Sequence, residues 1–422
     1  MILSFSVQNF KSIKDKATLS FEATADTTDE SAHIVKIGNT RVLKLAAIYG
    51  ANASGKTNLL QALDFLQDYV ANSIASLRPN EETGFIPFLF NAETRNSPGE
   101  FEIAFFIDNI KYEYALRLDY FSIQNERLFY SPKGQRKKIF ERIFNEENNN
   151  YQYNWGVDFK ISGNLVEKAR KNIPLLSTIV QLIDDKEIKK VYDWFDITLR
   201  TVITSYPQGL RQYTINMLED QPDYMGEIVS MLNSADIGNI IKINIKNIEI
   251  PNEVLESLPE EAKERFKDKS GKYQMKRVFV EHKYGKNNGQ IPIEDESLGT
   301  MRFFELAGPL GLSSSFPVTL SIDEIESSLH PELQEHLIAL FLQNSQRESQ
   351  LIFTTHNAEL MDSNLLRRDE IWFANKNNAT GGSEYYSLAD IKGVRKAGSF
   401  RKQYLSGKFG AVPVITNIPR EN

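Results

Sequence analysis

The sequence predicts an α/β fold, in which a sheet-based domain is interrupted by an inserted helical segment. Three observations lead to this prediction. An apolar run from Val42 to Tyr49 precedes a glycine-containing loop, and leucines at helical spacing follow it. Two later apolar runs, near positions 320 and 352, end in polar residues, as buried parallel strands do. Between positions 165 and 233 the apolar residues recur with a helical period. We therefore expect a mixed β lobe and a parallel-sheet core with a helical subdomain inserted.

Composition limits the classes of function. The chain has 422 residues, a formal net charge of −7, five histidines and no cysteine. Disulfides, thiolate nucleophiles and cysteine-based metal sites are therefore excluded. The first residues alternate like a strand and lack a basic leader, and no apolar run reaches the roughly 20 residues that span a bilayer. We expect a cytoplasmic protein with no membrane partner.

Strands and turns dominate the first part of the chain. The expected strands are Leu3–Phe10, Ala17–Phe21, Val42–Tyr49, Phe101–Ile107, Lys111–Leu118 and Arg127–Tyr130. Asp108-Asn109 is typical of a hairpin turn, and the polar stretch Asn145–Asn154 predicts an exposed loop.

Helical periodicity follows. One apolar stripe lies near Leu175–Ile183, and a second runs from Val191 through Leu199 to Val202. Strands are expected again at Ile241–Ile250 and Arg277–Lys283. We therefore divide the chain into residues 1–150, the first part of the sheet-based domain, 151–240, the helical insert, and 241–422, the second part of the sheet-based domain.

The loop after Tyr49 is a phosphate-binding loop. Its glycines let backbone N–H groups converge on phosphate oxygens, Lys56 reaches the outer phosphates, and the Thr57 hydroxyl can ligate Mg²⁺. The strand before it and the helix after it are the context that this chemistry needs. The residues expected to bind the nucleotide are Gly50, Asn52, Ala53, Ser54, Gly55, Lys56, Thr57 and Asn58.

Two later strand ends carry candidate catalytic groups. Asp323 and Glu324 follow an apolar strand, and we expect Asp323 to hold Mg²⁺ through water and Glu324 to accept a proton from the attacking water. His356 ends the next apolar strand, and its neutral imidazole is expected to contact the γ-phosphate or the attacking water. A strand can also end in acidic residues, and a histidine can be structural, without any such role.

A second helix start is a candidate anion site. Ser297 and Gly299 precede a helical stretch, where an ordinary N-cap is the alternative interpretation. Two basic clusters, around Lys133–Lys138 and Lys392–Lys408, are either solvated faces or contacts for a phosphate backbone or an acidic partner.

In this order the motifs resemble the ABC-type ATPase heads of SMC, Rad50, RecF and OLD proteins, and more narrowly the AAA15 family of anti-phage systems such as abortive-infection L and PARIS. Asn9–Ile13 is similar to the first strand and turn of these heads, and Gly50–Thr57 to Walker A. Ser297 and Gly299 match the signature motif, Asp323–Pro331 matches Walker B and the D-loop, and His356 matches the switch histidine. The sequence departs from the pattern at His330, where transporter-type heads carry aspartate.

This resemblance implies an ABC/SMC-type P-loop ATPase head that binds and hydrolyses ATP with Mg²⁺. It implies a homodimer or higher homo-oligomer in which ATP is sandwiched between Walker A of one copy and Ser297 and Gly299 of another. Lys11 and Ser12 are expected near the nucleotide. Gln124, or Glu126 beside it, is the candidate Q-loop residue, with Gln124 as a metal ligand.

The resemblance further implies a sensor and scaffold in phage defence. Such an ATPase controls a separate toxic effector, such as a TOPRIM or other nuclease, in response to a phage protein or a nucleic acid. The 66 residues after His356 are too few for an additional catalytic domain of ordinary size. The alternative is a DNA-binding repair ATPase like RecF, and a transporter-associated ATPase is a third.

Overall fold

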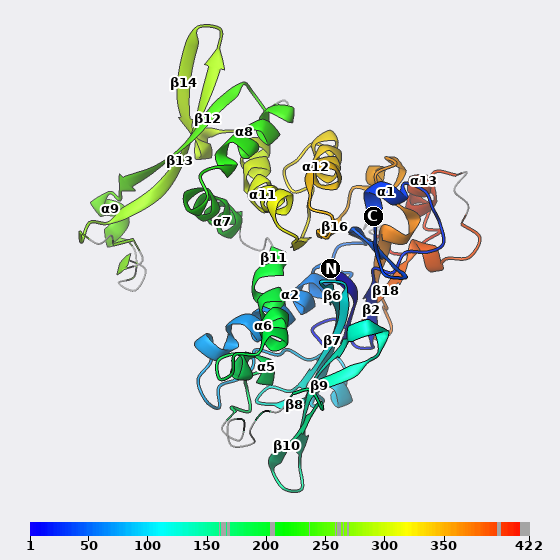
Figure 1. Cartoon of the computed structure of the whole chain (residues 1–422). Helices are drawn as coiled ribbons and strands as arrows, with labels where there is room; N and C mark the ends of the chain where they lie inside the picture. Colours follow the sequence, from blue (N-terminus) through cyan, green and yellow to red (C-terminus); the bar gives the residue numbers. More distant parts are fainter. Residues whose placement is uncertain are drawn as a thin grey trace, which may run out of the picture. The chain divides into compact units, whose positions relative to one another are not determined.

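A computed structural model describes most of the chain (Figure 1). The described part omits residues 160, 162–165, 167–168, 203–206, 236, 258, 260–262, 265, 268–269, 395–397 and 414–422. The chain forms two compact units, unit 1 (1–204, 315–326 and 337–422) and unit 2 (205–314 and 327–336). Their limits differ from those of the three segments expected from the sequence. In the described residues, no helix has the length and apolar character that crossing a membrane requires.

The β lobe of unit 1 is a seven-stranded antiparallel sheet in the order β10-β9-β8-β7-β6-β1-β2. Its strands are β1 (Ile2–Gln8), β2 (Ala17–Ser20), β6 (Gly99–Ile107), β7 (Ile110–Leu118), β8 (Ile123–Ser131), β9 (Lys137–Asn145) and β10 (Asn150–Trp155). Asp108 and Asn109 both have positive φ, at 50° and 63°, as the predicted hairpin turn between β6 and β7 requires.

The core of unit 1 is a six-stranded sheet in the order β11-β15-β16-β5-β17-β18. Its strands are β5 (Leu45–Tyr49), β11 (Leu199–Val202), β15 (Thr319–Ile322), β16 (Gln350–Thr355), β17 (Ile371–Lys376) and β18 (Ser383–Ser387). All neighbours pair in parallel except β17 and β18. The carboxyl ends of β15, β16 and β5 therefore lie along the same edge of the sheet.

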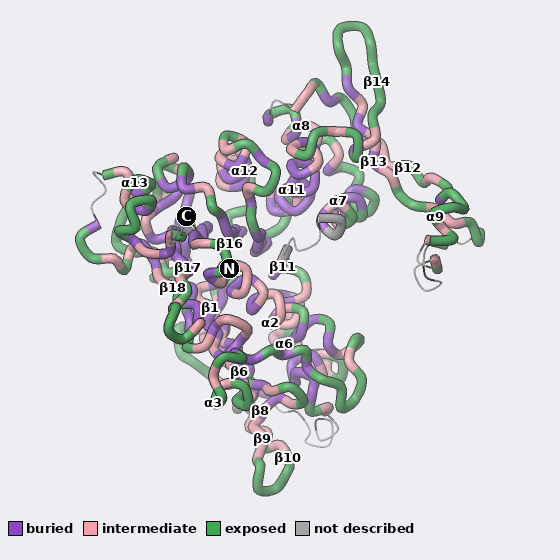
Figure 2. The backbone as a smooth tube through the Cα atoms, turned by 180° about the vertical axis from the view of Figure 1, so that it is seen from behind, coloured by how far each residue is buried: buried purple, intermediate pink, exposed green. Residues whose placement is uncertain are grey.

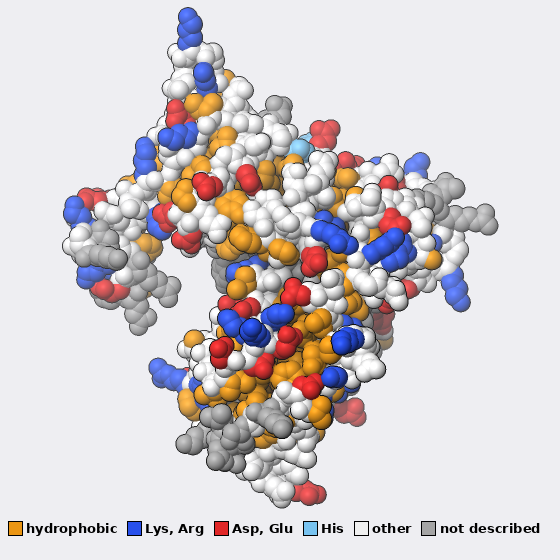
Figure 3. All heavy atoms as spheres, in the orientation of Figure 1, with side chains coloured by type: hydrophobic (Ala, Val, Ile, Leu, Met, Phe, Trp, Pro, Cys, Tyr) orange, Lys and Arg blue, Asp and Glu red, His pale blue; other side chains and the backbone are white. Residues whose placement is uncertain are grey.

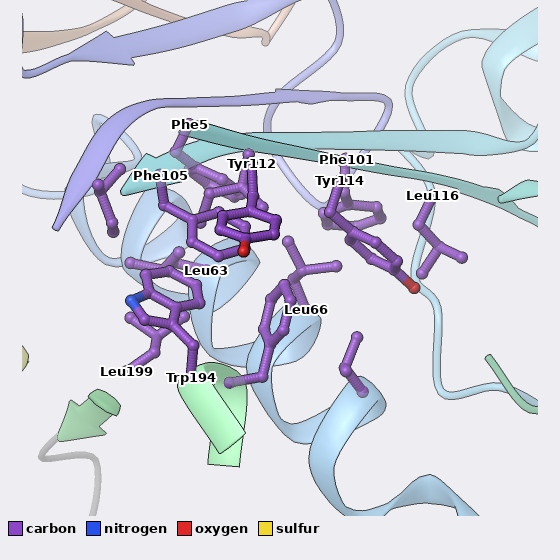
Figure 4. Close-up of a cluster of buried hydrophobic side chains, with 14 of the residues drawn as sticks. Phe5, Leu63, Leu66, Phe101, Phe105, Tyr112, Tyr114, Leu116, Trp194 and Leu199 are labelled. Atoms are coloured by element: carbon purple, nitrogen blue, oxygen red, sulfur yellow. The ribbon is translucent and has the colours of Figure 1, made fainter. Parts of the chain in front are cut away.

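Helix α2 (Lys56–Ser76) packs its apolar face against the β lobe. In Figure 4 side chains from β6 and β7 point toward Leu63 and Leu66 of this helix. The ring of Phe105 stacks on Trp194 with 3.9 Å between their centroids. This buried cluster fixes the helix that follows the phosphate-binding loop, because removing bulky apolar groups from such a core costs several kcal/mol.

Shorter elements complete unit 1. They are α1 (Glu30–His33), β3 (Ile34–Ile37), β4 (Thr40–Leu43), α3 (Ala92–Arg95), α5 (Leu175–Ile179), α6 (Lys186–Asp193) and α13 (Phe400–Leu405), with single helical turns at 132–134, 194–198, 358–362, 368–370 and 388–390.

Unit 2 combines helices with a three-stranded antiparallel sheet. The helices are α7 (Pro207–Asp220), α8 (Tyr224–Ser234), α9 (Asn252–Glu256) and α11 (Leu298–Ser315), and a helical turn covers 293–295. The sheet has the order β12 (Ile240–Glu249), β13 (Gln274–Tyr284) and β14 (Asn287–Pro292), which confirms the two strands expected here. Helix α12 (Pro331–Asn344) begins in unit 2 and ends in unit 1.

The fold class is confirmed as α/β with a mixed β lobe and a parallel core, but three local predictions are wrong. The expected strand Val42–Tyr49 is two strands, β4 and β5, which separate at Lys44 and join different sheets. The expected loop Asn145–Asn154 is mostly the β9–β10 hairpin, whose exposed tip Figure 2 shows in green. Leu199 and Val202 lie on strand β11, not on a helix, because pairing with β15 overrides the helical spacing.

Candidate nucleotide site

The phosphate-binding loop lies between β5 and α2 in unit 1. Ala53 and Gly55 have positive φ, at 60° and 105°, so the loop turns sharply before the helix begins at Lys56. A Cβ on Gly55 would lie 2.2 Å from Ser383 Oγ, and one on Gly50 would lie 2.4 Å from the Ala374 carbonyl oxygen. These two glycines are therefore required for the loop to pass close to β17 and β18.

Lys56 occupies the mouth of this loop. Its side chain is 6% exposed, and its ammonium donates to the carbonyl oxygens of Gly50 (2.9 Å) and Ala51 (3.2 Å). Burial lowers the pKa of Lys56, while the charges of Glu326, Asp323 and Glu324 oppose the shift. A buried ammonium held by two carbonyl oxygens is well placed to receive phosphate oxygens.

Thr57 and Asp323 form the expected metal half-site. The Thr57 hydroxyl donates to Asp323 at 2.9 Å, although the two residues are far apart in the sequence. Thr354, on the intervening strand β16, donates to the other Asp323 oxygen at 2.5 Å and so fixes the carboxylate. Mg²⁺ is held in such sites by one or two protein oxygens together with phosphates and water.

Glu324 directly follows this carboxylate and is exposed. Its φ is +47°, and its backbone N–H donates to the Thr354 hydroxyl at 2.7 Å. Left-handed backbone at a non-glycine residue is costly and is concentrated at functional sites. The backbone conformation of Glu324 therefore marks it as a candidate functional residue beside Asp323.

His356 follows β16 and is also exposed. Its backbone N–H donates to Glu326 Oε1 at 2.5 Å. Partial burial, and next the charge of Lys56, lower the pKa of His356, against the opposing charges of Glu326, Glu324 and Asp323. The imidazole is therefore neutral at pH 7 and able to accept or donate a hydrogen bond.

Lys11 and Ser12 lie on a turn beside the first turn of α2. The Ser12 hydroxyl accepts from Asn58 Nδ2 (2.6 Å) and bonds Ser383 Oγ (2.7 Å), whereas the Lys11 ammonium donates to Gln61 Oε1 (2.7 Å). The structure thus brings Ser12 and Asn58 together, and their place near the nucleotide stays a prediction.

Several residues around the loop carry no sequence signal that would single them out. Tyr385 donates its hydroxyl to the Gly55 carbonyl oxygen at 2.7 Å, and Ser383 lies against Gly55 itself. Both come from β18, which only the sheet order places here. Thr354 could have been found, because it directly precedes the polar end of β16.

Ser297 and Gly299 belong to unit 2, at the start of α11. The Ser297 hydroxyl accepts from the Thr300 backbone N–H at 3.0 Å, so it caps the helix. A Cβ on Gly299 would lie 3.3 Å from the Ser328 carbonyl oxygen, in the D-loop segment. Ser297 is therefore the N-cap of α11. That Ser297 and Gly299 also contact a nucleotide bound by a second copy of the chain stays a prediction.

Gln124 lies in the β lobe, on β8. Its amide donates to Asp119 Oδ2 (2.6 Å) and Ser122 Oγ (3.0 Å), in its own turn. Neighbouring Glu126 is fully buried and accepts from the N–H groups of Leu175 and Leu176 at the start of α5. Among the described residues, neither joins the cluster around Asp323. These contacts give Gln124 and Glu126 structural roles within the lobe.

The residues present fit a magnesium nucleotide. Within the described part of the chain, Ser54 Oγ and Glu326 Oε2 are buried without a hydrogen-bond partner. Such groups are expensive to leave unsatisfied, and both lie in the segments that meet at Lys56. No group of three or more histidine or acidic side chains among the described residues could hold a metal alone. Thr57 and Asp323 supply oxygen donors, which suit a Mg²⁺ ion whose other ligands are phosphates and water.

The first basic cluster is mostly neutralised. Arg136 pairs with Glu113, Lys137 with Asp158 (2.8 Å), and Lys138 with Glu141 (2.6 Å). Mixed charge also covers α6, where Figure 3 shows basic and acidic side chains side by side. In the second cluster Arg401 pairs with Glu359 (3.2 Å), and Arg395 and Lys396 lie outside the described residues.

Comparison with known proteins identifies related sequences and folds. Residues 45–362 match the family AAA_21, described as "AAA domain, putative AbiEii toxin, Type IV TA system". No curated protein matches the chain.

Solved SMC heads are similar over most of their length. An SMC head bound to the C-terminal winged-helix domain of ScpA shares 16% identity and covers 92% of this chain and 98% of its own, with a TM-score of 0.41. The SMC head of Thermotoga maritima shares 14% identity over 92% and 98%, with a TM-score of 0.42. An SMC head with an extended coiled coil and the C-terminal domain of ScpA, from Pyrococcus furiosus, shares 15% over 92% and 96%, with a TM-score of 0.39.

Proposed function

Because the chain belongs to the AAA_21 family, and is therefore a P-loop ATPase of the AAA/SMC-like kind, we propose that it binds and hydrolyses ATP to control its own assembly. The observation that carries this proposal is the 2.9 Å contact between Thr57 and Asp323, beside the buried ammonium of Lys56. A hydroxyl, a carboxylate and a lysine in this arrangement are what a Mg²⁺–triphosphate requires.

Each residue has a role in the proposed reaction. Lys56 and the N–H groups of the loop hold the outer phosphates, and Mg²⁺, held by Thr57 and Asp323, would neutralise the charge that develops during phosphoryl transfer. Glu324 accepts the proton of the attacking water. Neutral His356 orients that water or the γ-phosphate from the end of the neighbouring strand.

Assembly follows from the second helix start. Ser297 and Gly299 at the start of α11 would contact the γ-phosphate held by another copy, so that ATP joins two chains as a homodimer or a higher oligomer. Binding of ATP would stabilise this assembly by mass action, and hydrolysis would release it.

Within this scheme the protein acts as a sensor and scaffold in anti-phage defence, of the AAA15 and OLD-like kind. The family description, which names a type IV toxin–antitoxin system, supports coupling to a toxic activity. A separate effector, such as a TOPRIM or other nuclease, would be held or released when a phage protein or nucleic acid triggers the ATPase. The paired charges of Arg136, Lys137 and Lys138 give the RecF-like alternative no support.

Analytical ultracentrifugation with and without ATP and Mg²⁺ tests the proposal. We expect ATP-dependent association in the unmutated protein, none in Lys56→Ala, and persistent association in Glu324→Gln. Co-purification from cells that express the neighbouring genes tests the effector. Sedimentation that ATP leaves unchanged in both the unmutated protein and Glu324→Gln would contradict control by assembly.

A further inference from the structure

We propose that His282 is a positioning residue for ATP-dependent assembly, an inference that rests on the proposed function. His282 neutralises the Glu296 carboxylate, which directly precedes Ser297, and holds it against strand β13. A phosphate bound by a second copy of the chain can then approach the start of α11 without meeting a free negative charge. All of the contacts that carry this inference lie within unit 2.

The start of α11 follows an acidic segment. Three consecutive acidic residues, Glu294, Asp295 and Glu296, directly precede Ser297. A helix start favours anions, but a carboxylate beside it repels a phosphate. Consecutive Cα atoms are about 3.8 Å apart, and the Debye length is about 8 Å at physiological ionic strength, so salt would not screen this repulsion. An anion site at Ser297 therefore requires neutralisation of its acidic neighbours.

Strand β13 supplies the positive charges. His282 Nε2 lies 2.7 Å from Glu296 Oε1, and His282 Nδ1 lies 2.6 Å from the Gly238 carbonyl oxygen. Both partner atoms are acceptors, and only the imidazolium form of histidine has an N–H on each ring nitrogen. With both protons, the ring and the carboxylate form a neutral pair. Earlier on the same strand, Arg277 donates to Glu294 Oε2 at 3.0 Å.

The pair of His282 and Glu296 is firmly held. Their side chains are 8% and 12% exposed, and the Tyr284 ring lies nearly parallel to the imidazole, at 5°. The Glu296 backbone N–H donates to the carbonyl oxygen of the buried Ile293 at 3.2 Å. Ser297, in contrast, is exposed. The carboxylate is therefore held against the sheet, while the helix start stays open to a partner.

Analytical ultracentrifugation with ATP and Mg²⁺, at low and at high salt, tests this role. His282→Ala leaves the negative charge of Glu296 unpaired, so the dissociation constant of the assembly should rise about tenfold over that of the unmutated protein at low salt. At about 0.5 M salt the Debye length is only about 4 Å, so the ratio of the two constants should fall toward one. Isothermal titration should show unchanged ATP affinity for the monomer of this variant.

Removal of the carboxylate should rescue the assembly. Glu296→Gln, alone or combined with His282→Ala, should associate at low salt at least as tightly as the unmutated protein, because no negative charge remains at position 296. If the ring acted only by supporting the fold, the double variant would stay weak, because it lacks the same contact. His336→Ala is a matched control and should associate normally, since His336 of the same unit bonds a hydroxyl, that of Ser234, at 2.7 Å.

Normal association of His282→Ala at low salt would overturn the inference, as would a double variant that stayed weak. If His282→Ala did not fold, Glu296→Gln alone would still decide, because weaker association of that variant contradicts charge neutralisation. If ATP failed to associate the unmutated protein, the proposed function itself would fail, and this inference with it.

Discussion

Two helix starts with anion-binding composition differ in how their backbone donors are satisfied. Helix α2 begins after Gly55 with no side-chain cap, so the first N–H groups face the space that phosphates would occupy. Helix α11 begins after Ser297, whose own hydroxyl already accepts from the Thr300 N–H. The first start therefore has no side-chain cap on its donors, whereas at the second start one donor is already capped by Ser297. This difference explains why unit 1 is proposed to bind the nucleotide first and α11 only to meet it afterwards.

Removing the positive charge of Lys56, at the uncapped start of α2, should have the largest effect on ATP binding. In Lys56→Ala we expect at least about a hundredfold weaker ATP binding, because the buried ammonium has no substitute near the outer phosphates. Isothermal titration measures the change. Lys189→Ala, which removes an exposed lysine that pairs with Asp193, serves as the control and should bind normally. Normal affinity in Lys56→Ala would refute the site.

The substitution Glu324→Gln separates ATP binding from ATP hydrolysis. It should retain ATP affinity but lose about a hundredfold or more in kcat, because the amide cannot accept the proton of the attacking water. Phosphate release measured alongside nucleotide titration provides both values. The exposed residue Glu359 offers a control through Glu359→Gln. If Glu324→Gln hydrolysed ATP as fast as the unmutated protein, Glu324 would not be the general base.

The substitution Ser297→Arg tests the role of the start of α11, which Ser297 caps. A bulky side chain there should prevent ATP-induced association while leaving nucleotide binding by the monomer intact, which sedimentation and titration would detect. Ser297→Ala should instead lower the free energy of unfolding by about 1 kcal/mol through loss of the cap. Ser315→Arg, at the far end of α11, is the control for added charge. If ATP caused the Ser297→Arg variant to form the same oligomer as the unmutated protein, α11 would have no role in assembly.

The pH profile should show the smallest effect. Partial burial and the charge of Lys56 lower the pKa of His356, so the neutral form persists below the ordinary histidine value of about 6.5. We expect kcat to hold from pH 8 to 6.5 and to fall only at lower pH. His356→Asn should remove this dependence, while a fall in kcat that begins above pH 6.5 would argue against a neutral imidazole.

Much of the fold followed from local patterns. The Asp108-Asn109 turn and strands β12 and β13 were predicted because alternation and turn chemistry act over a few residues. Strand β11 was missed because its four residues have no period of their own and are defined by parallel pairing with β15. The β9–β10 hairpin was missed because its polar composition hides a strand that is stabilised by pairing across the turn.

The same division applies to the candidate site. Gly50, Gly55, Lys56, Thr57, Asp323 and His356 could be named as candidates from the sequence, because phosphate chemistry demands particular residue types in a particular order. Gln124 was a candidate by position along the chain, and the structure gives its amide partners in its own turn. The spacing of residues in the sequence does not show which groups a side chain contacts in the folded protein.

The amino-acid order alone determined that this chain carries a phosphate-binding loop and two acidic or polar strand ends. Only the tertiary structure decided that Thr354 fixes Asp323 and that Ser383 and Tyr385 close on Gly55. The physical reason is that a motif depends on a few residues that are neighbours in the sequence. These contacts depend instead on the order of strands in a sheet, which pairing between distant segments sets.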